Sequence, residues 1–311
     1  MTVKFHIPGI YSHFYLNVNL INLVHNRPEM FREGVEIASV YGTFPPAIWN
    51  GGRSFNEYVS LQDCRNIISH YNGRKVPVRF TFTNPMLEKR HLDDEFCNEL
   101  CRMAENDMNE IIVFMPMLEE YIRKKYPKFK FTSTTCKQIE DADKLREELE
   151  KDYHYVVLDY NWNNHFDFLE SIPHKEKCEF LVNAICRAHC PMRGKHYQFE
   201  GKQQIYINEV LPIAGESALF GRVTISGAGD DGLENDFVCP FNTSIESGMK
   251  EETYISPDAI YEKYVPMGFS NFKIEGRTAT DEEALGEYIK YMVRPEYADE
   301  VREKMQPYLL R

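Results

Sequence analysis

The sequence predicts an α/β fold: a (β/α)8, TIM-barrel-like domain with an insertion between its seventh and eighth strands. Three observations support this prediction. Short apolar runs alternate with stretches of helical period along most of the chain. The runs are mainly apolar, as expected for strands that are covered on both faces. A length of 311 residues is ordinary for one such barrel. The expected strands are residues 3–7, 35–41, 76–83, 111–115, 129–135, 155–160, 179–184 and 272–274.

The helices are predicted from apolar residues that recur every three or four positions. In residues 93–104, for example, Phe96, Leu100 and Met103 fall on one side of a helix. Between strands and helices, turn formers mark loops, as in residues 42–53 and at Asn84-Pro85. The expected helices are residues 14–24, 58–71, 93–104, 118–125, 139–151 and 166–172, with one long closing helix at 282–308.

One segment does not fit a plain barrel crossover. Residues 198–261 are too many for a single connection, so we interpret them as an inserted subdomain, with a strand expected at residues 204–211. No internal repeat, low-complexity tract or linker indicates a second independent unit. The prediction is therefore a single barrel domain, residues 1–311, that carries this insertion.

Composition excludes several classes of protein. A net charge of −12 argues against a broad nucleic-acid surface, which needs clustered Lys and Arg. No run approaches the ~20 apolar residues of a membrane helix, and residues 1–8 lack the apolar core of a signal peptide. We therefore expect a cytoplasmic protein without a membrane partner. Eight cysteines in such a compartment are unlike a disulfide framework.

The barrel prediction sorts these cysteines, because chemistry in such barrels belongs to the carboxyl ends of the strands. Cys186 and Cys190 follow the seventh strand, Cys136 follows the fifth, and Cys239 lies in the insertion that emerges on the same rim. We predict that these four thiols hold a metal or an iron–sulfur cluster. Four thiolates bind zinc equally well, and the alternative is a set of unrelated loop thiols.

The other cysteines are expected elsewhere. Cys178 begins the seventh strand, about 20 Å below the rim at strand rise, and is a poor partner for Cys186. Cys64, Cys97 and Cys101 fall in predicted helices and are interpreted as packing residues.

Polar side chains also follow the strands. They either orient a substrate or cap the helices that come next, which is the commoner role of Asn and Asp. We favour a catalytic role for Asn183 and Glu275, beside the cysteines and the Gly-Arg turn, and a substrate-binding role for Asn84 and Asp159. The residues at strand ends are Asn84, Asp159, Asn161, Asn163, Asn183 and Glu275.

A cationic group accompanies them. Arg193 and Arg277 suit a substrate carboxylate, because the guanidinium fork binds it through two hydrogen bonds. We add Tyr197 to the substrate-binding set and propose His196 as a general acid or base. Lys273 is interpreted as a surface charge. No dinucleotide fingerprint, HExxH, GxSxG or P-loop occurs, and Gly-Ala-Gly at 227–229 is followed by two aspartates.

Three stretches resemble a known family. They are FKIEGR at 272–277, after a segment that ends in YVPMG, the cysteine segment LVNAICRAHCPMRGKHY at 181–197, and VYGTFPPAIWNGGR at 40–53. Together they resemble the collagenase-like peptidase family, whose members are often described as peptidases of unassigned catalytic type.

The resemblance implies an activity and a cofactor. Several members of the family are implicated in oxygen-independent hydroxylation, of the ubiquinone ring or of a tRNA uridine, and carry a [4Fe–4S] cluster on four cysteines. Cys186 and Cys190 match the cysteines after the seventh strand, and Cys239 matches a later ligand. No further cysteine follows closely, so Cys136 is the predicted fourth ligand, and a three-cysteine cluster with an open iron also fits.

The resulting prediction is an iron–sulfur enzyme, hydroxylase-like, that acts on a small-molecule or RNA-borne substrate. The first alternative is a peptidase acting on unfolded or collagen-like polypeptide. The second is a non-catalytic subunit of a hetero-oligomer with a related chain.

Overall fold

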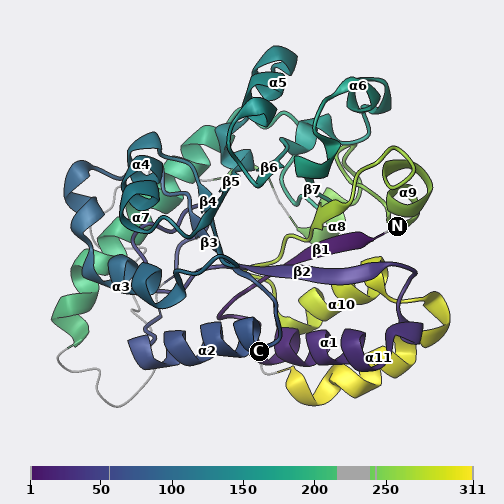
Figure 1. Ribbon diagram of the computed structural model, residues 1–311, viewed down its shortest axis with the longest axis horizontal. Coiled ribbons are helices and arrows are strands. Elements are labelled where there is room, and N and C mark those ends of the chain that lie inside the picture. The colour runs from purple at the N-terminus through teal and green to yellow at the C-terminus, as the bar shows by residue number, and fades with distance from the viewer. Residues whose placement is uncertain (1, 56, 216–238, 242–243, 310–311) are drawn as a thin grey trace.

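The computed structural model describes residues 2–55, 57–215, 239–241 and 244–309. Within them, eight strands pair in chain order into one closed barrel, and every neighbouring pair is parallel (Figure 1). The predicted (β/α)8 fold is confirmed. The strands are β1 Val3–Pro8, β2 Val35–Gly42, β3 Val78–Phe82, β4 Glu110–Val113, β5 Lys130–Ser133, β6 Tyr155–Val157, β7 Cys178–Leu181 and β8 Asn271–Lys273.

Helices cover the barrel from outside. Several begin at side chains that bond the free N–H groups of the first turn, as Ser60, Asp94 and Thr280 do. The α-helices are α1 Phe14–Asn26, α2 Leu61–Gly73, α3 Glu95–Ala104, α4 Pro116–Lys125, α5 Ala142–Glu150, α6 Phe166–Ser171, α7 Arg193–Gly215, α8 Ile245–Gly248, α9 Pro257–Ala259, α10 Asp281–Met292 and α11 Ala298–Met305. Shorter helical turns are η1 Pro28–Met30, η2 Lys89–Asp93, η3 Thr135–Lys137, η4 Tyr160–Trp162, η5 Lys175–Lys177, η6 Ile260–Tyr264, η7 Pro295–Tyr297 and η8 Gln306–Tyr308.

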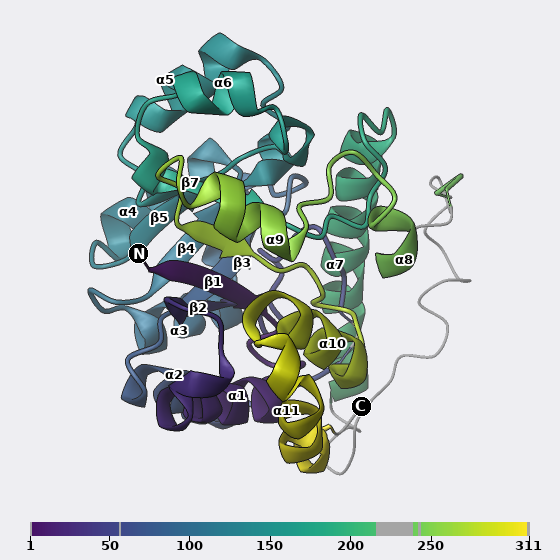
Figure 2. The same ribbon diagram turned by 90° about the vertical axis from the view of Figure 1, so that its right-hand side faces the viewer.

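The strand expected at residues 204–211 is wrong. These residues belong to α7, a long helix along one side of the barrel (Figure 2). The β-branched and aromatic content misled the prediction, whereas burial follows a helical period: Gly201, Gln204 and Ile207 are buried at intervals of three. The Gly-Ala-Gly motif and most of the remaining insertion lie outside the described residues.

The long closing helix at 282–308 is also wrong as a single element. It is divided into α10 and α11, because Pro295 cannot continue the hydrogen bonds of α10 and starts a new turn instead. Both pieces pack beside α1, which joins the end of the chain to its beginning.

The barrel core is continuous with the helix interfaces. Cys64, Cys97 and Cys101 are fully buried, which confirms that they pack in helices, and Cys178 begins β7 as expected. In the described part of the chain, no helix combines the length and apolar character needed to cross a bilayer.

Candidate functional site

A cavity of about 120 Å³ lies at the carboxyl ends of the strands. This is the end of a (β/α)8 barrel at which its loops build active sites. Residues at or beyond the ends of five strands line it: Tyr41, Thr83, Cys136, Leu181 and Glu275.

All four predicted metal ligands line this cavity: Cys136, Cys186, Cys190 and Cys239. Cys136 lies in η3 directly after β5, and Cys186 and Cys190 lie between β7 and α7. The expected convergence of distant thiols at one mouth of the barrel is thus present in the structure. Their role as ligands stays a prediction.

The thiols differ in surroundings. Burial raises the pKa of the Cys186 thiol, and the adjacent Cys190 raises it further, while the Tyr160 hydroxyl and Arg193 act in the opposite direction. In the described residues, no group of three or more Cys, His, Asp or Glu side chains is already gathered closely enough for one metal ion. A bound metal centre would therefore require these loop thiols to move toward one another.

Arg193 is held by the protein itself. Its guanidinium donates to Asp159 Oδ2 at 2.6 Å and to Thr135, and its Nε donates to the Tyr197 hydroxyl at 2.9 Å. The group also stacks on the Tyr160 ring and is only 3% exposed. Arg193 and Asp159 therefore form a buried pair, in which the carboxylate is committed to the arginine. The pair fixes the start of α7 against the loops after β5 and β6.

Arg277 is different. It donates to Thr81 Oγ1 at 2.8 Å, to Asn50 Oδ1 at 3.2 Å and to the Gly51 carbonyl at 3.0 Å, all of which are neutral acceptors. In the part of the chain that the structure describes, no carboxylate forms an ion pair with it. Burial and the nearby Arg53 lower its pKa, and its guanidinium lines the cavity. Of the two predicted anion-binding arginines, Arg277 has the unneutralised charge.

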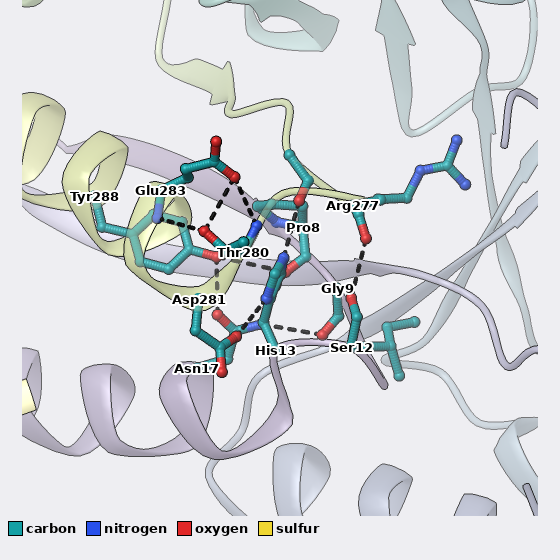
Figure 3. A network of polar contacts seen from close by, with 12 residues as sticks. Pro8, Gly9, Ser12, His13, Asn17, Arg277, Thr280, Asp281, Glu283 and Tyr288 are labelled. Atoms are coloured by element: carbon teal, nitrogen blue, oxygen red, sulfur yellow. Dashed lines mark hydrogen bonds and ion pairs between the residues drawn. The ribbon is translucent and has the colours of Figure 1, made fainter. Parts of the chain in front are cut away.

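The turn that carries Arg277 is anchored from below (Figure 3). His13, at the start of α1, lies between Asp281 and the Gly276 carbonyl, with its ring nitrogens 2.6 Å and 2.9 Å from these acceptors. Ser12 donates to the Arg277 carbonyl at 3.2 Å. Gly276 has a φ of 149°, which an L side chain rarely adopts. Ser12 and His13 thus hold the backbone of the turn that carries Arg277.

Glu275 lines the cavity but already has partners. Arg53 Nη2 is 2.7 Å from its Oε1, and the Ile185 N–H donates to its Oε2. The Asn183 side chain accepts from the Glu275 N–H at 2.6 Å and donates to Glu287. Asn183 therefore ties the ends of β7 and β8 together and does not line the cavity. Glu275 remains accessible from the cavity for a catalytic role.

Asn84 is also a structural link, since it donates to the carbonyls of Ile48 and Gly201 and accepts from the Met86 N–H. It is absent from the cavity wall. His196 and Tyr197 do line the cavity from the first turn of α7. His196 Nε2 lies 3.3 Å from Glu200. Burial alone would raise the pKa of Glu200, but hydrogen bonds from His196 and the Ser54 N–H lower it overall.

The interpretation of Lys273 as a surface charge is wrong. Lys273 ends β8 on its inner side, is 7% exposed, and pairs with Glu179. Three charged residues deeper in the barrel were also missed: Arg79, Glu110 and Glu179. Each belongs to a strand whose other residues are mostly apolar. The sequence signal that could have identified them is a charged residue at a position expected to be buried.

Arg53 is a further residue that the sequence did not single out. It lies in the loop after β2, lines the cavity, and pairs with Glu275, which follows β8 on the other side of β1. Gly51 in the same loop lies so close to β3 that a Cβ atom would be 2.4 Å from the Thr83 backbone. The Gly-Gly-Arg sequence was the available signal, because the glycines allow the loop to lie close to β3 and so place the arginine at the cavity.

Comparison with known proteins gives limited matches. No family model matches the chain. A segment of 63 residues, 20% of this chain, is 35% identical to the uncharacterized protease MJ1657 of Methanocaldococcus jannaschii, and it spans 19% of that protein. The solved structure of the U32 peptidase Mk0906 aligns with 88% of this chain and 92% of its own, at 12% identity and a TM-score of 0.47.

The segment match spans about one fifth of the curated relative, so that protein's whole activity is not transferred here. The two names are those of a protease and a peptidase, the class of protein that the motif resemblance predicted.

Proposed function

We propose that this chain is an enzyme of the collagenase-like peptidase family that binds an iron–sulfur cluster at the barrel mouth. The cluster would be held by Cys186, Cys190 and Cys239, with Cys136 as the fourth ligand. The proposed reaction is an oxygen-independent hydroxylation, or a related redox modification, of a small or RNA-borne substrate. The observation that carries this proposal is that four thiols from three separate segments line one cavity.

The chemistry of the donor set supports a cluster. Thiolates are soft ligands that select iron–sulfur centres, zinc or copper, whereas hard cations prefer oxygen ligands. Thiol ligands must lose their protons to bind, so the raised pKa of Cys186 predicts that binding releases protons and strengthens with rising pH. An iron–sulfur centre would supply electron transfer or an open iron position. The same four thiols would also accommodate zinc.

The remaining cavity residues would hold the substrate. Arg277 offers a guanidinium whose present partners are neutral, which suits an anionic group. Glu275 and His196 border the same space and would move protons. Tyr197 contributes an aromatic face, and its hydroxyl is committed to Arg193.

The test is iron and acid-labile sulfide analysis of protein purified without oxygen. We expect both elements together with visible absorbance, and loss of both in C186A, C190A and C239A. The matched control is C64A, which removes a buried thiol outside the cavity. Colourless protein with stoichiometric zinc, or iron that survives in C186A, would overturn the proposal.

A peptidase is the second candidate, favoured by the names of the two similar proteins. Glu275 would then activate water for attack on a peptide carbonyl. Cleavage of casein or gelatin by metal-free protein, abolished in E275A and retained in E246A, would favour this function over the first. Glu246 is an exposed glutamate in α8.

A further inference from the structure

Near the amino ends of the strands, the barrel interior contains a group of charged side chains that pair with one another. Arg79 in β3 pairs with Glu179 in β7 at 2.7 Å and with Glu110 in β4 at 3.3 Å. Each of these side chains is at most 3% exposed. Burying an ion is costly unless it is paired, which accounts for the mutual arrangement.

Lys273 lies between this group and the cavity. Its ammonium is 3.5 Å from Glu179 Oε1 on the inner side and 3.9 Å from the centre of the Tyr41 ring, and the residue lines the cavity. With Lys273 included, this group has two positive side chains, Arg79 and Lys273, and two negative ones, Glu110 and Glu179, so their formal charges cancel. Lys273 is the member of this group that also borders the ligand space.

The partners of Lys273 leave part of its hydrogen-bonding capacity unused. An ammonium has three N–H donors. The described residues give it one ion pair with a carboxylate and one contact with an aromatic face. A substrate atom in the cavity is therefore within the reach of a group that can give or take a proton.

We propose that Lys273 is an acid–base residue of the cavity, which holds a proton at its floor and exchanges it with a bound substrate. In the forward sense the ammonium donates one proton to a substrate atom that gains negative charge. The neutral amine left behind regains a proton from water when the product leaves. The inference rests on the proposed function only in placing the substrate in this cavity.

The surroundings support this role. Burial lowers the pKa of Lys273 to about 8, with Glu179 raising it and the cations Arg79 and Arg277 lowering it. Of its other neighbours, His6 on β1 is neutral, because burial lowers its pKa to about 3. Burial raises the pKa of Tyr41 on β2, so its hydroxyl keeps its proton. A lysine with a pKa near 8 is present in both its protonated and its neutral form near pH 7 to 8, as general acid–base catalysis at this pH requires.

The test uses cyanate, a small probe that fits the cavity. The lone pair of a neutral lysine amine adds to the carbon of isocyanic acid and gives a urea, with no leaving group. Mass spectrometry of the peptide that contains Lys273 reports the extent of reaction between pH 6 and pH 11. The fraction of cyanate present as isocyanic acid falls as pH rises, so the rate is divided by the concentration of isocyanic acid at each pH. We expect the resulting rate constant at Lys273 to level off above a midpoint near pH 8, whereas that of exposed lysines in the same sample increases up to about pH 10.

Two variants sharpen the result. R277Q removes a cation that lowers the pKa of Lys273, so the midpoint should move to higher pH. K273R should remove the early-titrating signal while the exposed lysines react as before. A midpoint near pH 10, or no reaction of Lys273 at any pH, would overturn the proposal.

The reaction needs no metal centre, so it is carried out on protein both with and without bound iron. If the protein binds no cluster but Lys273 reacts with a midpoint near pH 8, the cluster proposal fails and this inference stands. If the protein binds a cluster but the midpoint at Lys273 lies near pH 10, only this inference fails.

Discussion

Arg79 and Arg277 both reach into the barrel, one in its lower half and the other at its mouth, and their partners differ. Arg79 is completely buried between two carboxylates. Arg277 borders the cavity and donates to a threonine, an asparagine and a backbone carbonyl. Among the described residues, Arg79 near the amino ends of the strands is neutralised by carboxylates, whereas Arg277 at the mouth forms no ion pair with a carboxylate and could hold an anionic ligand. This division follows the general pattern in which the amino end of the strands supports stability and the carboxyl end supports function.

The largest effect should come from breaking the lower group. R79M removes the arginine that Glu110 and Glu179 share and leaves these buried carboxylates with only His154 and Lys273 as ionic partners among the described residues, so we expect a loss of about 3–5 kcal/mol in the free energy of unfolding. Urea unfolding measures it. R65M, at an exposed position of α2, is the control and should change stability by at most about 0.5 kcal/mol. A loss below about 1 kcal/mol in R79M would contradict the view that these charges stabilise one another.

Acid should weaken the same group. Burial would raise the pKa of Glu179, but Arg79, His6 and Lys273 lower it to about 2. The unfolded chain then binds a proton at Glu179 more readily than the folded chain does. Stability from this residue is therefore full above about pH 4.5 and is lost as pH falls toward 2, by an amount on the order of 3 kcal/mol.

His6 also makes the protein less stable as pH falls, and it does so over a wider range of pH. Because burial lowers its pKa from 6.5 to about 3, the unfolded chain gains a proton there between pH 6.5 and 3 while the folded chain does not. Unfolding free energies measured by urea at pH 7, 5 and 3 should decrease steadily. A flat profile over this range would disagree with both shifts.

A smaller effect is expected at the anchor of the mouth. In H13A the Gly276 carbonyl and the Asp281 carboxylate lose their shared partner, and we expect a loss of about 1.5–3 kcal/mol. Thermal unfolding measures the change. H25A, at an exposed position in the last turn of the same helix, should unfold like the parent protein, so an equal loss in both variants would assign the effect to α1 and not to the anchor.

The smallest effect on stability should come from Arg277 itself. R277Q removes a charge that forms no ion pair with a carboxylate in the part of the chain that the structure describes, so we expect a change of about 1 kcal/mol or less in unfolding free energy. Its effect should appear in ligand binding, where the affinity for inorganic phosphate at low salt should fall about tenfold, or 1.4 kcal/mol. Calorimetric titration compares R277Q with the parent protein. Equal affinities would show that the mouth does not bind anions through Arg277.

Much of the fold could be predicted because its signals are local. Apolar runs and helical periods identified all eight strands and the helices from α1 to α6, and the rule that active sites lie at the carboxyl ends of strands brought Cys136, Cys186, Cys190 and Cys239 to one rim. The errors arose where local composition and tertiary burial disagree. Residues 204–211 are rich in strand formers, yet they form part of a helix in which the buried Gln204 bonds to the loop after β2.

The functional contacts of single residues were less predictable. Asn84, Asp159 and Asn183 do follow strands, but the partners that occupy them, such as Gly201, Arg193 and Glu287, come from segments far away in the chain. Sequence spacing cannot distinguish a side chain that is committed to such a partner from one that is free for a ligand.

The sequence by itself determined the barrel, the order of its strands and the end at which its thiols would gather, because the alternation of apolar strands and amphipathic helices is written locally. Only the tertiary structure decided which charged side chains pair within the protein and which remain available to a ligand. Arg193 is neutralised by Asp159, Arg277 pairs with no carboxylate within residues 2–55, 57–215, 239–241 and 244–309, and Lys273 lies at the floor of the cavity instead of on the surface. These contacts join residues that are 34 positions apart for Arg193 and Asp159 and 196 positions apart for Arg277 and Thr81, and ion pairing and burial depend on the distances between them in space.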